Sequence, residues 1–395
     1  MSTDQYDAYP YPARDPKDER KRLVTGSPSH PREIDTHLFG GKRDWRKPFR
    51  ALVAGGGTGD ALVQMAQVLH ASKAPYEITY LDLSSSARAI AEARIKERRL
   101  PGVTFKTGSL LEADALGPFD YIDCCGVLHH LEDPVAGLRA LEGALAPGAG
   151  IGFMVYAPYG RSGVYPLQDA FRGLFKGLSP SDRLARAKEI MGKVPEGHPF
   201  RRNPHLGDHL RDEAGFYDLL LHEQDRAFAV DEWIGALGDA GLALTNWVAP
   251  ALYDLSMITP PPEHLGEVEA MALAEKLRGS LTKHLGYAQR AGERTAPLTA
   301  PSMSLVPHLD APRKDVAQAV AAGKQLQIKV QGVTFRLKLP QSAAGILARV
   351  NGQSALGDIA GAVSLDAVRF QALWVKIHAA LMATGTLTYS SLKAR

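Results

Sequence analysis

The amino-acid sequence predicts an α/β fold: a doubly wound, mainly parallel sheet with a helical cap insertion and a small C-terminal α+β domain. Three observations support this prediction. Between residues 49 and 156, short apolar strand patterns alternate with helical patterns, and the first strand runs into a glycine-rich turn. Residues 161–227 interrupt the alternation with helices, and residues 316–395 form a separate group of strands and helices. Alternating strands and helices with short connections build a parallel sheet covered on both faces.

The individual elements follow from local patterns. Runs of apolar and β-branched residues predict strands at residues 51–54, 76–83, 103–105, 119–125, 151–156 and 242–248. Between them, apolar residues recur at helical spacing. Ser84 and Asp133 stand where helix N-caps are expected, and Pro134 suits the first helical position. Ligands bind at the carboxyl ends of the strands in such sheets, so the loops there are the expected site.

The turn after the first strand has the pattern G-x-G-x-G, formed by Gly55, Gly57 and Gly59, with Gly56 inside it and Asp60 after it. A phosphate-binding P-loop would end in Lys-Ser/Thr, and a dinucleotide turn would have glycine where Asp60 stands. A negative side chain at the start of the next helix would also repel a pyrophosphate. The pattern favours a cofactor without phosphate, such as S-adenosylmethionine, over an unrelated glycine-rich loop.

Further cofactor contacts are expected after the next three strands. Asp82 lies about 20 residues beyond the glycines at the end of the second strand, a position suited to the ribose hydroxyls. Its alternative role is to cap the next helix. Ser109 follows the third strand and is expected beside the adenine, although a serine is a weaker partner than the acid often found there. The expected contacts in these loops are Asp82, Leu83, Ser109, Leu110, Gly126 and Val127.

The stretches VAGGGTGD, LDLSSSAR and YIDCCGVLHHLEDPVAGLRAL resemble those of class I S-adenosylmethionine-dependent methyltransferases, which have a Rossmann-like fold. Together with LLLHEQDRAF, they resemble a bacterial group in which a methyltransferase regulatory domain follows the catalytic domain. That group is similar to bacterial protein-lysine methyltransferases that modify outer-membrane protein. The resemblance implies S-adenosylmethionine as methyl donor, S-adenosylhomocysteine as product, and a protein lysine as acceptor.

One position departs from that family. Many class I methyltransferases carry an acid where Val53 stands, and it helps to orient the methionine end of the cofactor. Recognition of the cofactor's amino group here must depend on backbone carbonyls, on Asp60, or on a residue from elsewhere in the chain.

Four residues after the fourth and fifth strands are the candidate catalytic residues: His129, His130, Tyr156 and Tyr159. An unperturbed histidine has a pKa of about 6.5 and can accept a proton from an acceptor amine. The tyrosines could orient the acceptor. The alternative for either histidine is packing, or capping of the helix that begins at Asp133.

Three functions remain open: methyl transfer to a protein side-chain amine, methyl transfer to a small metabolite, and cofactor sensing without catalysis. An enclosed pocket of metabolite size would favour the second, and a groove towards residues 316–395 would favour the first. The insertion supplies further candidates to face the acceptor, namely Tyr165, Gln168, His205, His209, Tyr217 and His222. His205 and His209 have a spacing that can bind zinc, but no zinc signature accompanies them, so we expect no metal.

Composition sets the remaining expectations. The chain has 395 residues, a net charge of +3 and 45% hydrophobic residues, as a globular protein with a full core does. The charge is too small to indicate a nucleic-acid partner. We expect no membrane span and no signal peptide. Cys124 and Cys125 are neighbours on a strand and point to opposite faces, so we expect reduced thiols and a cytoplasmic protein.

Four segments describe the expected domain organisation. Residues 1–48, which contain Tyr6, Tyr9 and Tyr11, form an extension that is either a lid over the crevice or a loosely docked arm. Residues 261–315 are expected to be helical over 263–290 and then a linker. The period-2 runs around Gln331-Gly332 predict a hairpin, and three helices after it suggest a winged-helix-like module for protein contact, homodimer formation or substrate docking. The expected segments are 1–48, 49–260 (the methyltransferase domain), 261–315 and 316–395.

Overall fold

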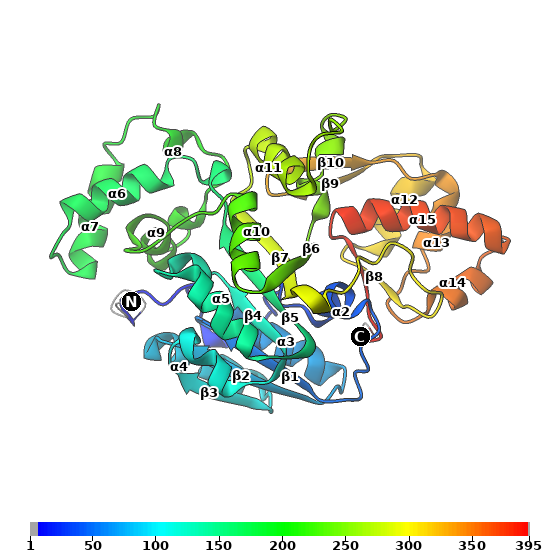
Figure 1. Ribbon diagram of the computed structural model, residues 1–395, viewed down its shortest axis with the longest axis horizontal. Helices are drawn as coiled ribbons and strands as arrows, with labels where there is room; N and C mark the ends of the chain where they lie inside the picture. Colours follow the sequence, from blue (N-terminus) through cyan, green and yellow to red (C-terminus); the bar gives the residue numbers. More distant parts are fainter. Residues whose placement is uncertain (1–6, 394–395) are drawn as a thin grey trace.

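The computed structural model describes residues 7–393 and contains a seven-stranded central sheet in the order β3-β2-β1-β4-β5-β7-β6 (Figure 1). The first five strands run parallel, while β7 is antiparallel to both β5 and β6. The predicted mainly parallel α/β sheet is therefore confirmed. The strands are β1 (Phe49–Ala54), β2 (Tyr76–Asp82), β3 (Val103–Thr107), β4 (Phe119–Cys125), β5 (Leu145–Tyr156), β6 (Leu242–Trp247) and β7 (Lys283–Arg290).

Two of the helices around this sheet begin where the sequence predicts. The Ser84 side chain accepts a hydrogen bond from Ala87 and caps one helix, and Asp133 caps another that begins at Pro134. These bonds satisfy backbone donors that a helix start otherwise leaves free. The helices are α3 (Asp60–Ala71), α4 (Ser85–Arg98), α5 (Pro134–Gly143), α10 (Val230–Asp239) and α11 (Glu267–Arg278).

The expected helix over residues 263–290 is wrong in its second half. The helix α11 ends at Gly279, whose φ of 63° lies in the left-handed region. Residues 283–290 then form β7 between β5 and β6, where Tyr287 and Ala288 are fully buried. Pairing on both sides and burial override the local helical pattern. The sheet thus continues past residue 260, where we expected its domain to end.

The N-terminal segment lies across the glycine turn. Tyr6 lies outside the described residues. We refer to residues 7–29 as the strap. Thr58 donates a hydrogen bond of 2.7 Å to the Pro12 carbonyl, and Arg14 pairs with Asp60. The strap contains a short 3₁₀ helix, η1 (Pro16–Arg20), and leads into α2 (Pro31–Phe39), a helix that the sequence analysis missed.

The insertion after β5 is helical, as predicted, and lies at one end of the molecule (Figure 1). It has a small hydrophobic core of its own that includes Phe171, Phe200 and Leu220. Tyr9 of the strap stacks on Tyr217 with 4.9 Å between ring centroids, which ties the strap to the insertion. The helices are α6 (Val164–Leu174), α7 (Pro180–Met191), α8 (Pro199–Arg202) and α9 (Glu213–Leu221).

The C-terminal region lies at the other end (Figure 1). The predicted hairpin is confirmed as β9 (Leu326–Val330) and β10 (Val333–Leu337). It precedes three helices, and a second sheet pairs β8 (Pro307–Leu309), inside the expected linker, with β11 (Leu387–Tyr389). The likeness to a winged helix stays a prediction. The helices here are α12 (Arg313–Ala321), α13 (Ala344–Leu347), α14 (Leu356–Ala362) and α15 (Ala367–Ala383).

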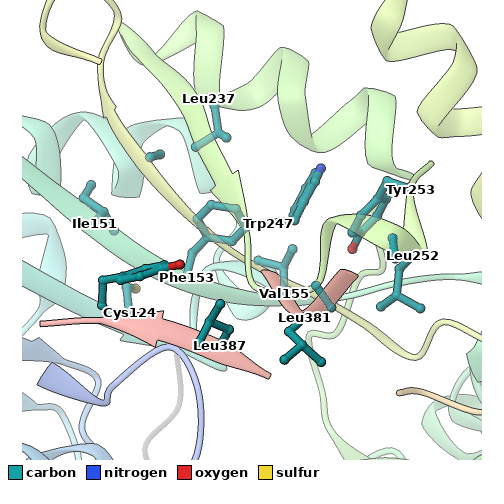
Figure 2. Packing of buried hydrophobic residues seen from close by; sticks show 14 of the residues in the cluster. Cys124, Ile151, Phe153, Val155, Leu237, Trp247, Leu252, Tyr253, Leu381 and Leu387 are labelled. Atoms are coloured by element: carbon teal, nitrogen blue, oxygen red, sulfur yellow. The ribbon is translucent and has the colours of Figure 1, made fainter. Parts of the chain in front are cut away.

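The C-terminal region shares the main hydrophobic core with the sheet. Leu381 of α15 and Leu387 of β11 lie in one cluster with Phe153 and Val155 of β5 (Figure 2). Within residues 7–393, no helix is both long enough and apolar enough to cross a membrane. The remaining 3₁₀ helices are η2 (Leu110–Leu116), η3 (Leu128–His130), η4 (Tyr159–Arg161), η5 (Asp208–Leu210), η6 (Pro250–Leu252), η7 (Leu255–Met257), η8 (Ala291–Glu293) and η9 (Gln341–Ala343).

Candidate active site

A cavity of about 420 Å³ lies at the carboxyl ends of the parallel strands, between the glycine turn, the strap and the insertion. It brings together most of the residues that the sequence singled out. Those that line it are Gly55, Gly56, Gly57, Asp60, Asp82, Leu83, Ser109, Leu110, Gly126, Val127, His130 and Tyr156. Gly59, His129 and Tyr159 are not among the lining residues.

The glycine turn packs too closely for side chains. A Cβ atom on Gly55 would collide with Val127, and one on Gly56 would collide with the Tyr80 ring. Gly57 has a φ of 51°, which favours glycine, and its amide donates a 2.7 Å hydrogen bond to Asp82. The turn therefore presents bare backbone to the cavity.

Asp82 is held in place by two backbone amides. Gly57 donates to one carboxylate oxygen, and Ser84 donates to the other at 2.8 Å. Burial raises the pKa of Asp82, while these hydrogen bonds act in the opposite direction. A carboxylate oxygen has two lone pairs, so each oxygen can still accept a hydroxyl. This arrangement suits a ribose, and the role stays a prediction.

Asp60 is bound by two guanidinium groups. Arg14 of the strap donates to both of its oxygens at 2.8 and 2.6 Å, and Arg94 of α4 donates at 2.8 Å. Although burial alone would raise the pKa of Asp60, these arginines hold it below its usual value. Asp60 is one of three alternatives for holding the cofactor's amino group, and two arginines balance its charge. Asp60 also anchors the strap to the turn, and its contact with the cofactor stays a prediction.

Ser109 caps the helix η2. Its hydroxyl accepts a 3.2 Å hydrogen bond from the Leu111 amide, and Leu110 beside it is buried. Both residues line the cavity next to Leu83. Their place beside an adenine stays a prediction.

The far end of the cavity has a buried polar cluster formed by Tyr156, Arg161 and Asp218, which we call the acceptor cluster. The Tyr156 hydroxyl donates a 3.1 Å hydrogen bond to Asp218. Burial, reinforced by the charge of Asp225, raises the pKa of Asp218 to about 7. Arg161 lies 3.5 Å over the Tyr156 ring and pairs with Asp225 at 2.8 Å.

The two histidines lie beside this cluster in neutral form. His130 has its Nδ1 atom 2.9 Å from the Gln224 carbonyl oxygen, so in the neutral ring Nδ1 carries the proton. Burial lowers the pKa of both histidines, and the pKa of His129 is far below its usual value. The His129 ring packs on Tyr156, and within the described chain neither of its nitrogens has a hydrogen-bond partner.

The insertion residues are distributed around the site. Only His205 of the predicted set lines the cavity. Gln168 and Tyr165 do not line the cavity: Gln168 donates a hydrogen bond to Asp225, and the Tyr165 hydroxyl accepts one from Arg161. The His222 ring stacks on His130 with 3.7 Å between ring centroids. Tyr217 stacks on Tyr9, and His209 packs against Phe200.

Two groups of side chains have metal-ligating atoms within 4.8 Å of one another: His129, His130 and Asp225, and His130, Asp218 and His222. The positive guanidinium of Arg161 pairs with Asp225 in the first group. It also packs on Tyr156, which binds Asp218 of the second group. A fixed cation at this position opposes a second one, so we assign no metal.

The sequence analysis missed several lining residues. Arg161, Asp218 and Lys283 reach the cavity only through the folding of the insertion and β7. The strap contributes residues 24–27 and Ser29, for which the sequence gives no motif. Asp123, which also lines the cavity, could have been found from the sequence, because it is a charged residue inside the apolar strand FDYIDCC.

Comparisons with known proteins agree with this geometry. A family described as a methyltransferase domain matches residues 52–151. An uncharacterized protein of Synechococcus sp. is 32% identical over 244 residues, which cover 59% of this chain and 57% of that protein. The matched region thus spans little more than half the length of this relative.

Solved structures show the same fold over nearly the whole chain. PKMT2 from Rickettsia typhi covers 94% of this chain and 78% of its own, with a TM-score of 0.61 and 16% identity. The same protein in complex with AdoHcy covers 92% of this chain and 76% of its own, with a TM-score of 0.57 and 15% identity.

The cavity fits S-adenosylmethionine. Its volume lies within the range of about 300–1,000 Å³ that holds one drug-sized ligand. It offers a carboxylate at Asp82 and bare backbone at the glycine turn. Sequence family, fold and cavity agree. The chain contains a class I S-adenosylmethionine-dependent methyltransferase domain.

Proposed function

We propose that this protein transfers a methyl group from S-adenosylmethionine to a side-chain amine of a protein, and that the amine is a lysine. The observation that carries the proposal is the hydrogen-bonded pair of Tyr156 and Asp218 at the end of the cavity. A buried carboxyl group with a pKa of about 7 can hold a proton that a nucleophile must lose.

Methyl transfer to an amine requires three contributions from the protein. The cofactor supplies a methyl group that is already activated, so the residues need to align the acceptor, exclude water and take a proton. A lysine amine has a reference pKa of about 10.4 and enters as an ammonium. Burial and the charge of Arg161 favour its neutral form. Asp218 would take one proton from the ammonium, and the nitrogen lone pair freed in this way would form the new N–C bond as the S–C bond breaks. The products would be S-adenosylhomocysteine and a methylated ammonium.

The cavity favours a side chain over a free metabolite. Its volume matches one ligand of the cofactor's size and leaves little room for a second enclosed molecule. The C-terminal region contributes none of the lining residues, so the structure does not show the groove towards residues 316–395 that we considered. Its hairpin nevertheless reaches the rim, where Gln331 bonds to Thr282 and Lys283 and Gly332 lies against His205.

Label transfer tests the proposal. The purified protein is incubated with methyl-tritiated S-adenosylmethionine and lysate of its own organism, and the products are separated by size. We expect label on a protein band, and peptide mass spectrometry should place the methyl groups on lysine. Label only in the small-molecule fraction would contradict a protein acceptor, and methylated residues other than lysine would contradict the amine. The variant Asp218→Asn is the matched control and should label the same band much more slowly.

A further inference from the structure

Asp123 is a buried carboxylate in the middle of a core strand. Its side chain lines the cavity, although the residue is only 1% exposed. In the parallel pairing of β1 with β4, Asp123 lies directly opposite Val53. Paired residues on neighbouring strands point to the same face and lie about 5 Å apart. Family members carry an acid at the position of Val53. The carboxylate of Asp123 therefore lies beside that position, on the neighbouring strand.

This carboxylate has hydrogen bonds but no counter-charge. The hydroxyl groups of Ser29 and Tyr121 bond to it, the latter at 3.2 Å. The Tyr121 hydroxyl oxygen also lies 2.9 Å from the Pro28 carbonyl oxygen. Because a hydroxyl has one proton, Tyr121 can donate either to Pro28 or to Asp123, but not fully to both. Among the described residues, no ion pair joins Asp123 to an arginine, lysine or histidine, Lys283 of the same cavity included.

A buried carboxylate without a cation is costly. Burial raises the pKa of Asp123 to about 6, which is the response of an acid that lacks a positive partner. The other acids of the cavity are already engaged. Asp60 pairs with two arginines, and Asp208 pairs with Arg211. Asp82 accepts from two backbone amides, and Asp218 accepts from Tyr156. Asp123 is thus the acid best able to receive a positive group of a ligand.

We propose that Asp123, supported by Ser29 of the strap, binds the α-ammonium group of the cofactor's methionine end and replaces the acid that is absent at Val53. The inference rests on S-adenosylmethionine as the cofactor of the proposed function, but not on the identity of the acceptor. It also gives the strap a role in binding, because Ser29 lines the cavity beside Asp123.

Calorimetric titration with two ligands tests this assignment without turnover. S-adenosylhomocysteine carries the ammonium group, and 5′-methylthioadenosine lacks the whole amino-acid end. Asp123→Asn should weaken binding of the first by about 10- to 100-fold, the usual loss for a hydrogen bond to a charged group, and leave the second unchanged. Equal losses for both ligands, or no loss for either, would overturn the assignment.

A relocated acid provides the sharper test. The double variant Val53→Asp/Asp123→Val moves the carboxylate to the opposite position in the same register. We expect it to regain most of the affinity for S-adenosylhomocysteine that Asp123→Val alone loses. Asp120→Asn is the control, since Asp120 lies on the same strand but outside the cavity, and it should change the affinity for neither ligand. Circular dichroism and thermal melts verify that each variant is folded.

The outcomes separate this inference from the proposed function. Selective loss of S-adenosylhomocysteine binding in Asp123→Asn, without label on any protein, would support the inference and contradict a protein acceptor. Wild-type protein that binds neither ligand would overturn both.

Discussion

Two buried acids, one at each end of the cavity, have different charged neighbours. Asp123 lies near the glycine turn without a cation, whereas Asp218 shares its surroundings with Arg161 and a second acid, Asp225. Both carboxyl groups have raised pKa values because both are buried. The first is suited to binding a fixed positive charge and the second to accepting a proton. The same physical cause, desolvation, can thus serve binding at one end and proton transfer at the other.

The role of Asp218 predicts a pH-dependent rate. Below about pH 7 the group is protonated and cannot accept a proton, so the rate should rise with pH through this range and then level off. Asp218→Asn should lower kcat by about 100-fold and abolish this limb of the profile. Tyr156→Phe removes a hydrogen bond that lowers the pKa of Asp218, so it should move the limb to higher pH. An unchanged limb in Asp218→Asn would rule out Asp218 as the proton acceptor.

Elements could be predicted from the sequence where local chemistry decides them. The glycine turn, the caps at Ser84 and Asp133, and the hairpin at Gln331-Gly332 follow from short-range rules. The strand β7 could not be predicted, because only its two neighbours in the sheet stabilise it as a strand. The residues of the site likewise fall into those that local sequence predicts and those that only tertiary packing brings there. Asp82 follows the predicted geometry of a strand end, whereas Asp218 reaches the cavity through the tertiary packing of the insertion.

The strap is an element whose position depends on one buried ion-pair network. Arg94 of α4 is fully buried and bonds to Glu19 of η1 at 2.7 Å, to Asp60 and to the Thr58 carbonyl. Arg94→Ala should destabilise the protein by about 3 kcal/mol, because buried Glu19 and half-buried Asp60 each lose one of two arginine partners. Chemical denaturation measures this change.

A control for this prediction lies on the same helix. Arg88 pairs with Glu92 on the surface, where both side chains are more than 30% exposed. Arg88→Ala should cost less than about 1 kcal/mol. Equal effects of the two substitutions would show that the buried network does not hold the strap.

At the scale of the whole molecule, we expect the C-terminal region to unfold together with the sheet. Its core is continuous with that of the sheet (Figure 2). Its last residues also bind α2, where the Tyr389 amide donates to Thr36 at 2.8 Å and Ser390 donates to Asp35 at 2.6 Å. Since α2 follows the strap, these residues of the C-terminal region bind the helix into which the strap leads. This arrangement links the C-terminal region, through α2, to the strap that lines the cavity.

Leu381 tests this coupling. It is 1% exposed and packs where α15 meets the sheet (Figure 2). Leu381→Ala should lower the free energy of unfolding by about 2–5 kcal/mol, because it opens a cavity in the shared core. Val368→Ala on the same helix is the control, since Val368 is 80% exposed and should change stability by less than about 0.5 kcal/mol. In calorimetry, Leu381→Ala should shift a single transition, and S-adenosylhomocysteine should shift that transition back. Two transitions, with only one moved by Leu381→Ala and the other by ligand, would show instead that the C-terminal region folds as a separate module.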